Sequence, residues 1–237
     1  MISIVIPTYN HCDDLLKPCI ESILKHTDFR DVELIVSMNG CTDNTVDYVK
    51  YVASAFRQMG LESHFIVKIS PEPLGYAGAC NAGIRAARGD TIILLNNDCV
   101  LLEQPRNLWL EILNRPFQDA DCGISCIIKS PSEATGRDFA VFFCVAIRKA
   151  VFDKIGLLDA SYEVGGGEDM AFCFEAEQAG FKIAEVFEKF NDGKQYTGNF
   201  PIWHKGEGTV HDPKIVTDWE GQFRKNILKV EIGRAHV

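Results

Sequence analysis

The chain has 237 residues, 46% of them hydrophobic, which suits a globular domain with one sizeable core. Its 24 basic and 33 acidic residues give a net charge of −9, which excludes a domain-wide basic surface for nucleic acid. No apolar run approaches the roughly 18 residues of a membrane-spanning helix, and an apolar strand starting at Ile2 leaves no room for a signal peptide.

Strand and helix patterns alternate through the first half of the chain. Apolar runs predict four strands, and helical spacing of apolar residues predicts three helices between them. The strands are Ser3–Ile6, stopped by Pro7, then Glu33–Val36, His64–Ile69 and Thr91–Leu95. The helices are Asp14–Lys25, a helix capped by Thr42-Asp43 and running to Phe56, and Tyr76–Ala87, closed by Gly89. This order predicts an α/β domain with a mostly parallel central sheet and flanking helices.

The second half is less regular. The predicted strands are Cys122–Ile128, Phe139–Ile147 and Lys182–Val186, with a polar, mobile loop over Ser130–Arg137. The predicted helices are Glu168–Gln178, which stops at Gly180, and Asp218–Leu228. No linker or repeat divides the chain. We therefore expect one domain over residues 1–230, truncated near Val230, with residues 231–237 as a non-native tail that resembles translated sequencing adapter.

The nine cysteines do not form a recognisable disulfide or zinc pattern. Their number is odd, their spacings are scattered, and no Cys-x-x-Cys pair occurs. Cys80, Cys99, Cys126 and Cys144 lie among apolar or small residues, where a free cysteine behaves as a small hydrophobic residue. This usage predicts a reducing, cytoplasmic location, at most at the inner face of a membrane.

Polar residues follow the predicted strands of the first half. The segments are Pro7-Thr8-Tyr9-Asn10, Asn39 to Asp43, and Asn96-Asn97-Asp98. Because ligands bind outside the carboxyl ends of strands in open α/β sheets, we expect these groups to meet at one edge. The small residues from Gly75 to Gly83 allow a backbone to approach a nucleotide and the sheet closely. Their spacing matches neither the dinucleotide-binding nor the P-loop pattern.

Asp98 is the predicted ligand of a divalent cation. Magnesium and manganese bind one or two carboxylates together with substrate phosphate oxygens, and an imidazole ligand favours manganese. His204 is the preferred imidazole because Lys205-Gly206 beside it suits a loop that closes on a diphosphate, and His211 is the competing candidate. The alternative interpretations are an Asx turn that ends the strand at Asp98 and a packed, structural histidine at 204.

Asp169 is the predicted catalytic base. It follows three glycines and lies in the first turn of a predicted helix, with Glu168 placed to orient an acceptor or tie the loop. Capping of the helix dipole is the alternative, and it explains the acidic residues but not the glycines.

These segments, in this order, resemble the inverting, nucleotide-sugar-dependent glycosyltransferases of family 2 over nearly all of residues 1–210. The matching segments are Ile4 to Asn10, Asn39-Gly40-Cys41-Thr42-Asp43, Leu74 to Gly83, Leu95-Asn96-Asn97-Asp98, Gly167-Glu168-Asp169 and His204-Lys205-Gly206. The chain departs from the family pattern at Met38, where an Asp is frequent, at Ala171, where another acid is frequent, and at Phe174-Glu175, which replaces a frequent Leu-Arg.

The resemblance implies a GT-A (Rossmann-like) fold and inversion at the anomeric carbon. It implies a nucleoside-diphosphate-sugar donor, a Mn²⁺ or Mg²⁺ ion on Asp98 and His204, and catalysis by Asp169 with Glu168. It also implies a glycan, lipid-linked or protein hydroxyl acceptor, as in polysaccharide biosynthesis, and is compatible with peripheral membrane association. The residues expected to contact the donor are Pro7, Thr8, Tyr9, Asn10, Asn39, Asp43, Gly75, Gly78, Asn81 and Asn97.

Two other functions remain open from the sequence. A nucleotidyltransferase can use a similar sheet, but it needs basic residues for a triphosphate near the first loop, and residues 7–16 hold no Lys or Arg. A non-catalytic module that binds a sugar nucleotide or a glycan would bind the donor without consuming it.

Overall fold

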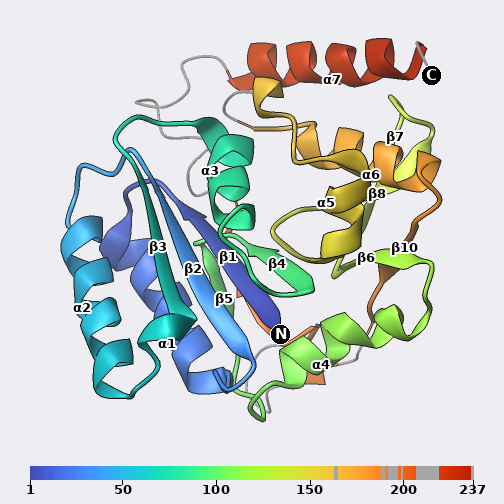
Figure 1. Ribbon diagram of the computed structural model, residues 1–237. Coiled ribbons are helices and arrows are strands. Elements are labelled where there is room, and N and C mark those ends of the chain that lie inside the picture. Colours follow the sequence, from blue (N-terminus) through green and yellow to red (C-terminus); the bar gives the residue numbers. More distant parts are fainter. Residues whose placement is uncertain (163–164, 188–189, 192–196, 199, 207–218, 236–237) are drawn as a thin grey trace.

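The computed structural model describes residues 1–162, 165–187, 190–191, 197–198, 200–206 and 219–235. A seven-stranded sheet in the order β10-β6-β9-β4-β1-β2-β3 forms its centre (Figure 1). Its strands are β1 (Ile2–Thr8), β2 (Val32–Asn39), β3 (Phe65–Ser70), β4 (Thr91–Leu95), β6 (Cys122–Cys126), β9 (Cys144–Arg148) and β10 (Lys182–Glu185). Only β9 among these seven runs antiparallel to its neighbours, so the predicted mostly parallel sheet is confirmed.

Helices cover both faces of the sheet. The helices are α1 (Lys17–His26), α2 (Thr45–Gln58), α3 (Gly75–Ile84), α4 (Leu108–Asn114), α5 (Lys149–Ile155), α6 (Glu168–Gln178) and α7 (Trp219–Ala235). Helix α7 crosses the molecule at the end of the sheet where the β3–α3 loop also lies (Figure 1). None of the described helices is both long and apolar enough to cross a bilayer.

The core has two layers because strand side chains alternate between the faces. Ile4 and Ile93 belong to the layer beneath α1, α2 and α4, whereas Val5 and Ile92 belong to the layer beneath α3, α5 and α6. This double coverage explains the uninterrupted apolar run of β4, whose predicted bounds are confirmed. All nine cysteines are free, and eight of them are buried, as their apolar settings predicted.

Smaller elements complete the chain. Three two-stranded sheets pair β5 (Cys99–Leu101) with β13 (Ile202–His204), β7 (Lys129–Ser132) with β8 (Arg137–Ala140), and β11 (Phe190–Asn191) with β12 (Thr197–Gly198). Short helices are η1 (Cys12–Leu16), η2 (Glu62–His64), η3 (Arg115–Gln118) and η4 (Ala160–Tyr162).

Several predicted bounds in the first half are wrong. Pro7 does not stop β1. It has no backbone N–H to donate to the neighbouring strands, but it stays in register with Ser37 of β2. Helix α2 begins at Thr45, after the predicted cap, although the Asp43 carboxylate does accept the Thr45 N–H at 3.1 Å. Helix α3 ends at Ile84, well before Gly89.

The predicted mobile loop Ser130–Arg137 is instead the β7–β8 hairpin, which packs against α6 through Ser132 and Met170. The predicted strand Phe139–Ile147 is interrupted at residues 141–143, so that β8 and β9 belong to different sheets. Strand Cys122–Ile128 ends earlier, at Cys126, and the last helix runs further, to Ala235. The sequence interpretation missed β5, β13, α4 and α5, which are short.

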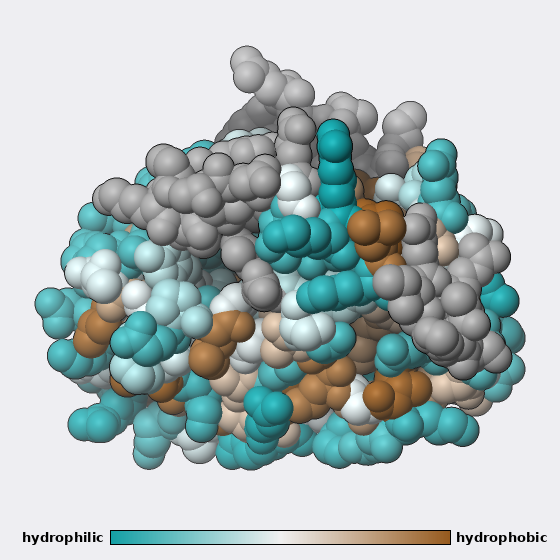
Figure 2. All heavy atoms as spheres, turned by 90° about the horizontal axis from the view of Figure 1, so that it is seen from above, coloured by the Kyte–Doolittle hydropathy of each residue, from teal (hydrophilic) through white to brown (hydrophobic). Residues whose placement is uncertain are grey.

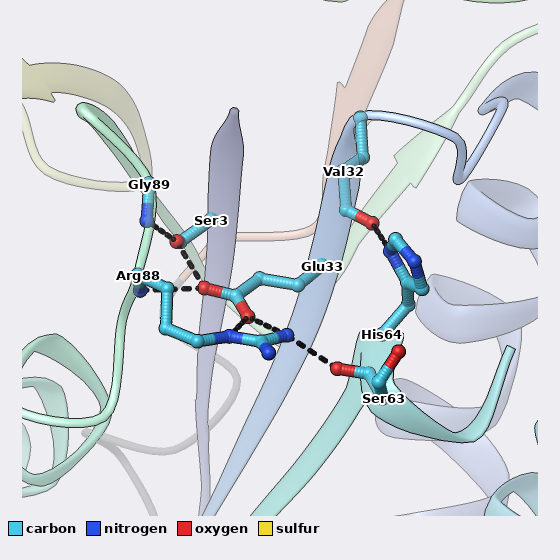
Figure 3. Close-up of polar contacts among 7 residues, drawn as sticks. All are labelled: Ser3, Val32, Glu33, Ser63, His64, Arg88 and Gly89. Atoms are coloured by element: carbon cyan, nitrogen blue, oxygen red, sulfur yellow. Dashed lines mark hydrogen bonds and ion pairs between the residues drawn. The ribbon is translucent and has the colours of Figure 1, made fainter.

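One buried acid, Glu33, joins several segments at the amino ends of the strands, opposite the edge where the candidate site lies. Glu33 in β2 is fully buried and accepts hydrogen bonds from Ser3 Oγ at 2.5 Å, Arg88 N at 2.7 Å and Arg88 Nε at 2.7 Å (Figure 3). Gly89 N donates to Ser3 Oγ at 2.8 Å, and a Cβ on Gly89 would lie 2.7 Å from the Met1 carbonyl oxygen. Gly89 is thus required for close approach to β1, not for ending a helix.

Replacing Arg88 is expected to destabilise the fold because it leaves the Glu33 carboxylate buried without its guanidinium. We expect Arg88→Met to lower the free energy of unfolding by about 3 kcal/mol, the lower end for a broken buried pair, since Ser3 and a backbone N–H still donate. Arg30→Met breaks the exposed pair with Asp28 and should leave the free energy of unfolding nearly unchanged, because solvent screens that pair. Equal losses in urea unfolding would contradict the role of Glu33.

Candidate active site

The loops after β1 and β2 are joined by side-chain hydrogen bonds. Asn10 Oδ1 accepts the backbone N–H of Thr42 at 2.7 Å and of Asp43 at 3.2 Å. The Asp43 carboxylate accepts the Cys12 N–H at 3.0 Å. The predicted meeting of these strand ends is therefore confirmed. Figure 2 shows the molecule from this end, where hydrophilic side chains and a few hydrophobic ones lie at the surface.

The β3–α3 segment is tied to the same edge. Asn39 Oδ1 accepts the Leu74 N–H at 2.5 Å, and its Nδ2 donates to the Gly75 carbonyl oxygen at 3.3 Å. Helix α3 lies close on the sheet, because a Cβ on Gly83 would come within 2.3 Å of Val5 Cγ1. The predicted close approach of this segment to the sheet is confirmed.

Some of the remaining residues that were predicted to contact the donor already use their side chains in hydrogen bonds within the protein. Asn81 is buried, and its amide bonds the Leu158 backbone at 2.7 Å and 3.1 Å, so it holds the segment after α5. Asn97 Nδ2 donates to Thr8 Oγ1 at 3.0 Å and links the ends of β4 and β1. Tyr9 is half-buried just beyond β1. Pro7 lies inside β1, and Gly78 lies inside α3.

Asp98 and His204 form a buried pair at the end of β4. Asp98 Oδ1 lies 3.2 Å from His204 Nε2, and the exposed fractions of the two side chains are 6% and 27%. Neither atom has a hydrogen-bond partner with good geometry among the described residues. Two unsatisfied buried ligand atoms so close together suit a shared divalent cation, since buried polar groups otherwise find partners.

The neighbouring strands and a ring hold His204 in place. Strand β13 pairs with β5, which sets His204 opposite Cys99, and the Lys205 N–H donates to the Asp98 carbonyl oxygen at 3.1 Å. The imidazole stacks on Phe143 with ring centroids 4.4 Å apart and planes at 6°. The histidine therefore needs no bound ion to be oriented toward Asp98.

Cys99 lies close enough to be a third ligand, since one ligand atom from each of Asp98, Cys99 and His204 falls within 4.8 Å of the others. Its thiol, however, donates to the Phe143 carbonyl oxygen at 3.5 Å. Burial raises the pKa of the Cys99 thiol well above its ordinary value. A neutral, already bonded thiol fits a hard cation poorly, so the carboxylate and imidazole are the fitting pair.

Two adjacent acids begin α6. Gly165, Gly166 and Gly167 precede them with φ of +132°, +90° and +105°, a region that side chains with a Cβ rarely adopt. The triple glycine is therefore a backbone requirement of the turn that delivers Glu168 and Asp169 to this point. Glu168 is buried and its Oε2 has no hydrogen-bond partner in the described structure, whereas Asp169 is partly buried and accepts the Met170 N–H at 2.8 Å.

Burial and mutual repulsion weaken both acids. Burial raises the pKa of Glu168 to about 8, and the neighbouring Asp169 charge adds to the shift. Burial also raises the pKa of Asp169 to about 6, although the backbone N–H groups of Met170 and Phe142 favour its charged form. Their closeness and burial disfavour two negative charges on the pair, and the backbone N–H groups that face Asp169 favour its ionised form over that of Glu168.

The Phe142-Phe143 dipeptide joins the two halves of the site. The Phe142 backbone faces the Asp169 carboxylate, and its carbonyl oxygen accepts the Tyr76 hydroxyl at 2.6 Å. The Phe143 carbonyl oxygen accepts the Asn96 N–H at 2.8 Å, and the Phe143 ring carries His204. The sequence interpretation missed both residues because an aromatic pair inside an apolar run looks like strand core. His211 and part of the Val164–Gly167 loop lie outside the described residues.

Two solved structures with the same architecture are glycosyltransferases. A mannosyltransferase from Pyrobaculum calidifontis, solved with GDP-Man and Mn²⁺, aligns with a TM-score of 0.63 and 17% identity over 78% of this chain and 54% of its own. GalNAc-T7, solved with UDP, GalNAc and Mn²⁺, aligns with a TM-score of 0.62 and 17% identity over 78% of this chain and 42% of its own. The fold is thus that of GT-A enzymes, as expected.

One sequence relative is named as a glycosyltransferase, and another is uncharacterized. Glycosyltransferase GlyG of Streptococcus pneumoniae is 31% identical over 124 residues, 52% of this chain and 37% of its own length. The uncharacterized protein y4gI of Sinorhizobium fredii is 23% identical over 76% of this chain and 23% of its own length. The chain thus spans about a quarter to just over a third of these relatives. The model of glycosyl transferase family 2 matches residues 3–138, more than half of the chain, and the chain therefore belongs to that family.

Proposed function

We propose that this chain transfers a sugar from a nucleoside diphosphate to a hydroxyl acceptor, with inversion and with a divalent cation. One observation carries the proposal: an unsatisfied Asp98–His204 pair and a buried acid pair, Glu168–Asp169, are joined through Phe142-Phe143. The GDP-Man, the UDP and the Mn²⁺ bound in the structural neighbours support the same donor class. The acceptor is a hydroxyl of a glycan, lipid-linked glycan or protein, and the nine free thiols favour a cytoplasmic setting.

The proposed chemistry is a single displacement. Asp169 takes the proton of the acceptor hydroxyl while that oxygen forms a bond to the anomeric carbon. The bond from that carbon to the diphosphate oxygen breaks on the opposite face, and its electron pair leaves with the nucleoside diphosphate. A cation bound by Asp98 and His204 would neutralise the charge that develops on this leaving group. Glu168, neutral near pH 7, adds no second negative charge beside the diphosphate.

The proposed cation site of Asp98 and His204 is tested by thermal unfolding with UDP, GDP, dTDP and CDP, each with and without Mn²⁺. A ligand at about 100 times its dissociation constant should add about 2.7 kcal/mol, and we expect one nucleotide to stabilise the chain only with metal. Asp98→Asn should abolish that gain because it removes the charged ligand, whereas exposed Asp47→Asn should keep it. Metal-dependent stabilisation that survives in Asp98→Asn would refute this site.

The base is tested with Asp169→Asn, which keeps the shape of the side chain but removes its basicity. We expect transfer to fall by about 10² or more while the nucleotide and Mn²⁺ still stabilise the protein. The matched control is Asp153→Asn on α5, an exposed acid paired with Lys149, which should keep full transfer. Release of nucleoside diphosphate from the donor found by the binding screen measures the rate. Turnover near wild type in Asp169→Asn would exclude this base.

The raised pKa values predict two pH effects of definite sign. Transfer should rise with pH through about 6, because only ionised Asp169 accepts a proton. Since the folded state holds the Glu168 proton up to about pH 8, the free energy of unfolding should fall as pH rises from about 4.5 to 8. Glu168→Gln should therefore gain at least about 1.4 kcal/mol over wild type between pH 5 and pH 9 in urea unfolding. A constant difference would mean that Glu168 titrates normally.

A further inference from the structure

The turn Gly165–Gly167, which leads into Glu168 and Asp169, has no side chains that could stabilise its conformation. Gly165 N donates to the Tyr162 carbonyl oxygen at 3.1 Å, and Gly165 is the first of three consecutive glycines with positive φ. Glycine has more backbone freedom than other residues, so three in a row leave the approach to Asp169 weakly defined by local preference. A contact from elsewhere in the chain is needed to fix it.

Helix α7 supplies that contact through Asn226. This side chain is fully buried, and its Nδ2 donates to the carbonyl oxygens of Tyr162 at 3.2 Å and of Gly165, the first of the three glycines, at 3.0 Å. Its Oδ1 accepts from Gln222 Nε2 at 3.1 Å. Both N–H groups of the amide are thus used on the turn, and its oxygen is turned to its own helix.

The surroundings of Asn226 hold α7 against the turn. Val230 packs in a small buried cluster with Tyr162, Met170 and Ala134, and the Lys229 ammonium lies 5.3 Å from the centre of the Tyr162 ring. A Cβ on Gly167 would lie 3.1 Å from the Tyr162 ring and 3.5 Å from Asn226 Cβ. The third glycine thus admits both the ring and the helix to the point where α6 begins.

We propose that Asn226 is a positioning residue for the acid pair, holding the backbone carbonyl groups of Tyr162 and Gly165 so that Glu168 and Asp169 meet the acceptor in one geometry. The inference rests on the proposed role of Asp169. A small displacement of a catalytic group costs rate, about 10²-fold for 1 Å, without removing the group itself. The last helix would then be part of the catalytic machinery, although it touches no reacting atom.

The test is Asn226→Asp, which has the same shape but sets a carboxylate oxygen against two carbonyl oxygens. We expect kcat to fall at least about tenfold with KM for the donor within about twofold, and nucleotide-dependent stabilisation to persist. Hydrogen exchange of the amides of residues 165–170 should accelerate, while those of β1 and β4 stay unchanged. Lys225→Ala, an exposed residue one position earlier on α7, is the matched control and should change none of these.

Asn226→Ala decides the question if the Asp variant fails to fold, because it removes both hydrogen bonds without adding charge. Full kcat in Asn226→Ala, or faster exchange at 165–170 with unchanged kcat, overturns the positioning role. Comparison with Asp169→Asn separates the two proposals. If Asp169→Asn retains turnover, the proposed base is wrong. If Asp169→Asn is inactive and Asn226→Ala is fully active, only the role of Asn226 fails.

Discussion

The interruption of the sheet at residues 141–143 is the constraint on which the site depends. If β8 continued into β9, the backbone groups of Phe142 and Phe143 would pair with neighbouring strands. Because the strand breaks there, one peptide segment turns a backbone group toward Asp169 and a ring under His204, while its carbonyl oxygens bond Tyr76 and Asn96. Of the candidate cation ligands, Asp98 follows β4 and His204 lies in β13, whereas the candidate base lies in α6. The Phe142-Phe143 segment contacts both parts of the site and so helps to fix their relative position.

The acid pair depends on a second constraint, which is backbone geometry. Carboxylates at the start of a helix are favoured by its dipole and by free N–H groups, which lowers their pKa. Here burial outweighs that effect, so both pKa values are raised. The turn of three glycines drives the start of α6 into the protein, beneath Tyr162 and against Asn226, instead of leaving it at the surface where such acids usually lie.

The parts that could be predicted from sequence are those where local pattern and tertiary environment agree. The bounds of β4 and α6 were predicted correctly because a doubly covered strand is apolar throughout and because Gly167 and Gly180 bracket the helix. Gly89 was noticed for the wrong reason, since its lack of a Cβ serves contact with β1. The β7–β8 hairpin and the role of Phe142-Phe143 could not be predicted, because they follow from packing on α6 and from a strand break that no local motif marks. The same holds for Asn226, one asparagine in an otherwise ordinary helix.

Charge explains why the proposed site needs both halves. The chain carries a net charge of −9, and Asp98, Glu168 and Asp169 all lie in its candidate site, yet the proposed donor is an anion. Lys205 offers little relief, since its ammonium lies 3.6 Å from Asp14 at the surface. A cation on Asp98 would offset one carboxylate, and the raised pKa of Glu168 removes another by keeping it protonated. Asp169 then keeps the negative charge of the acid pair, which is what a base facing a hydroxyl requires. In the proposed mechanism, burial of the acid pair and a cation held by Asp98 and His204 would thus both reduce the negative charge that faces the donor.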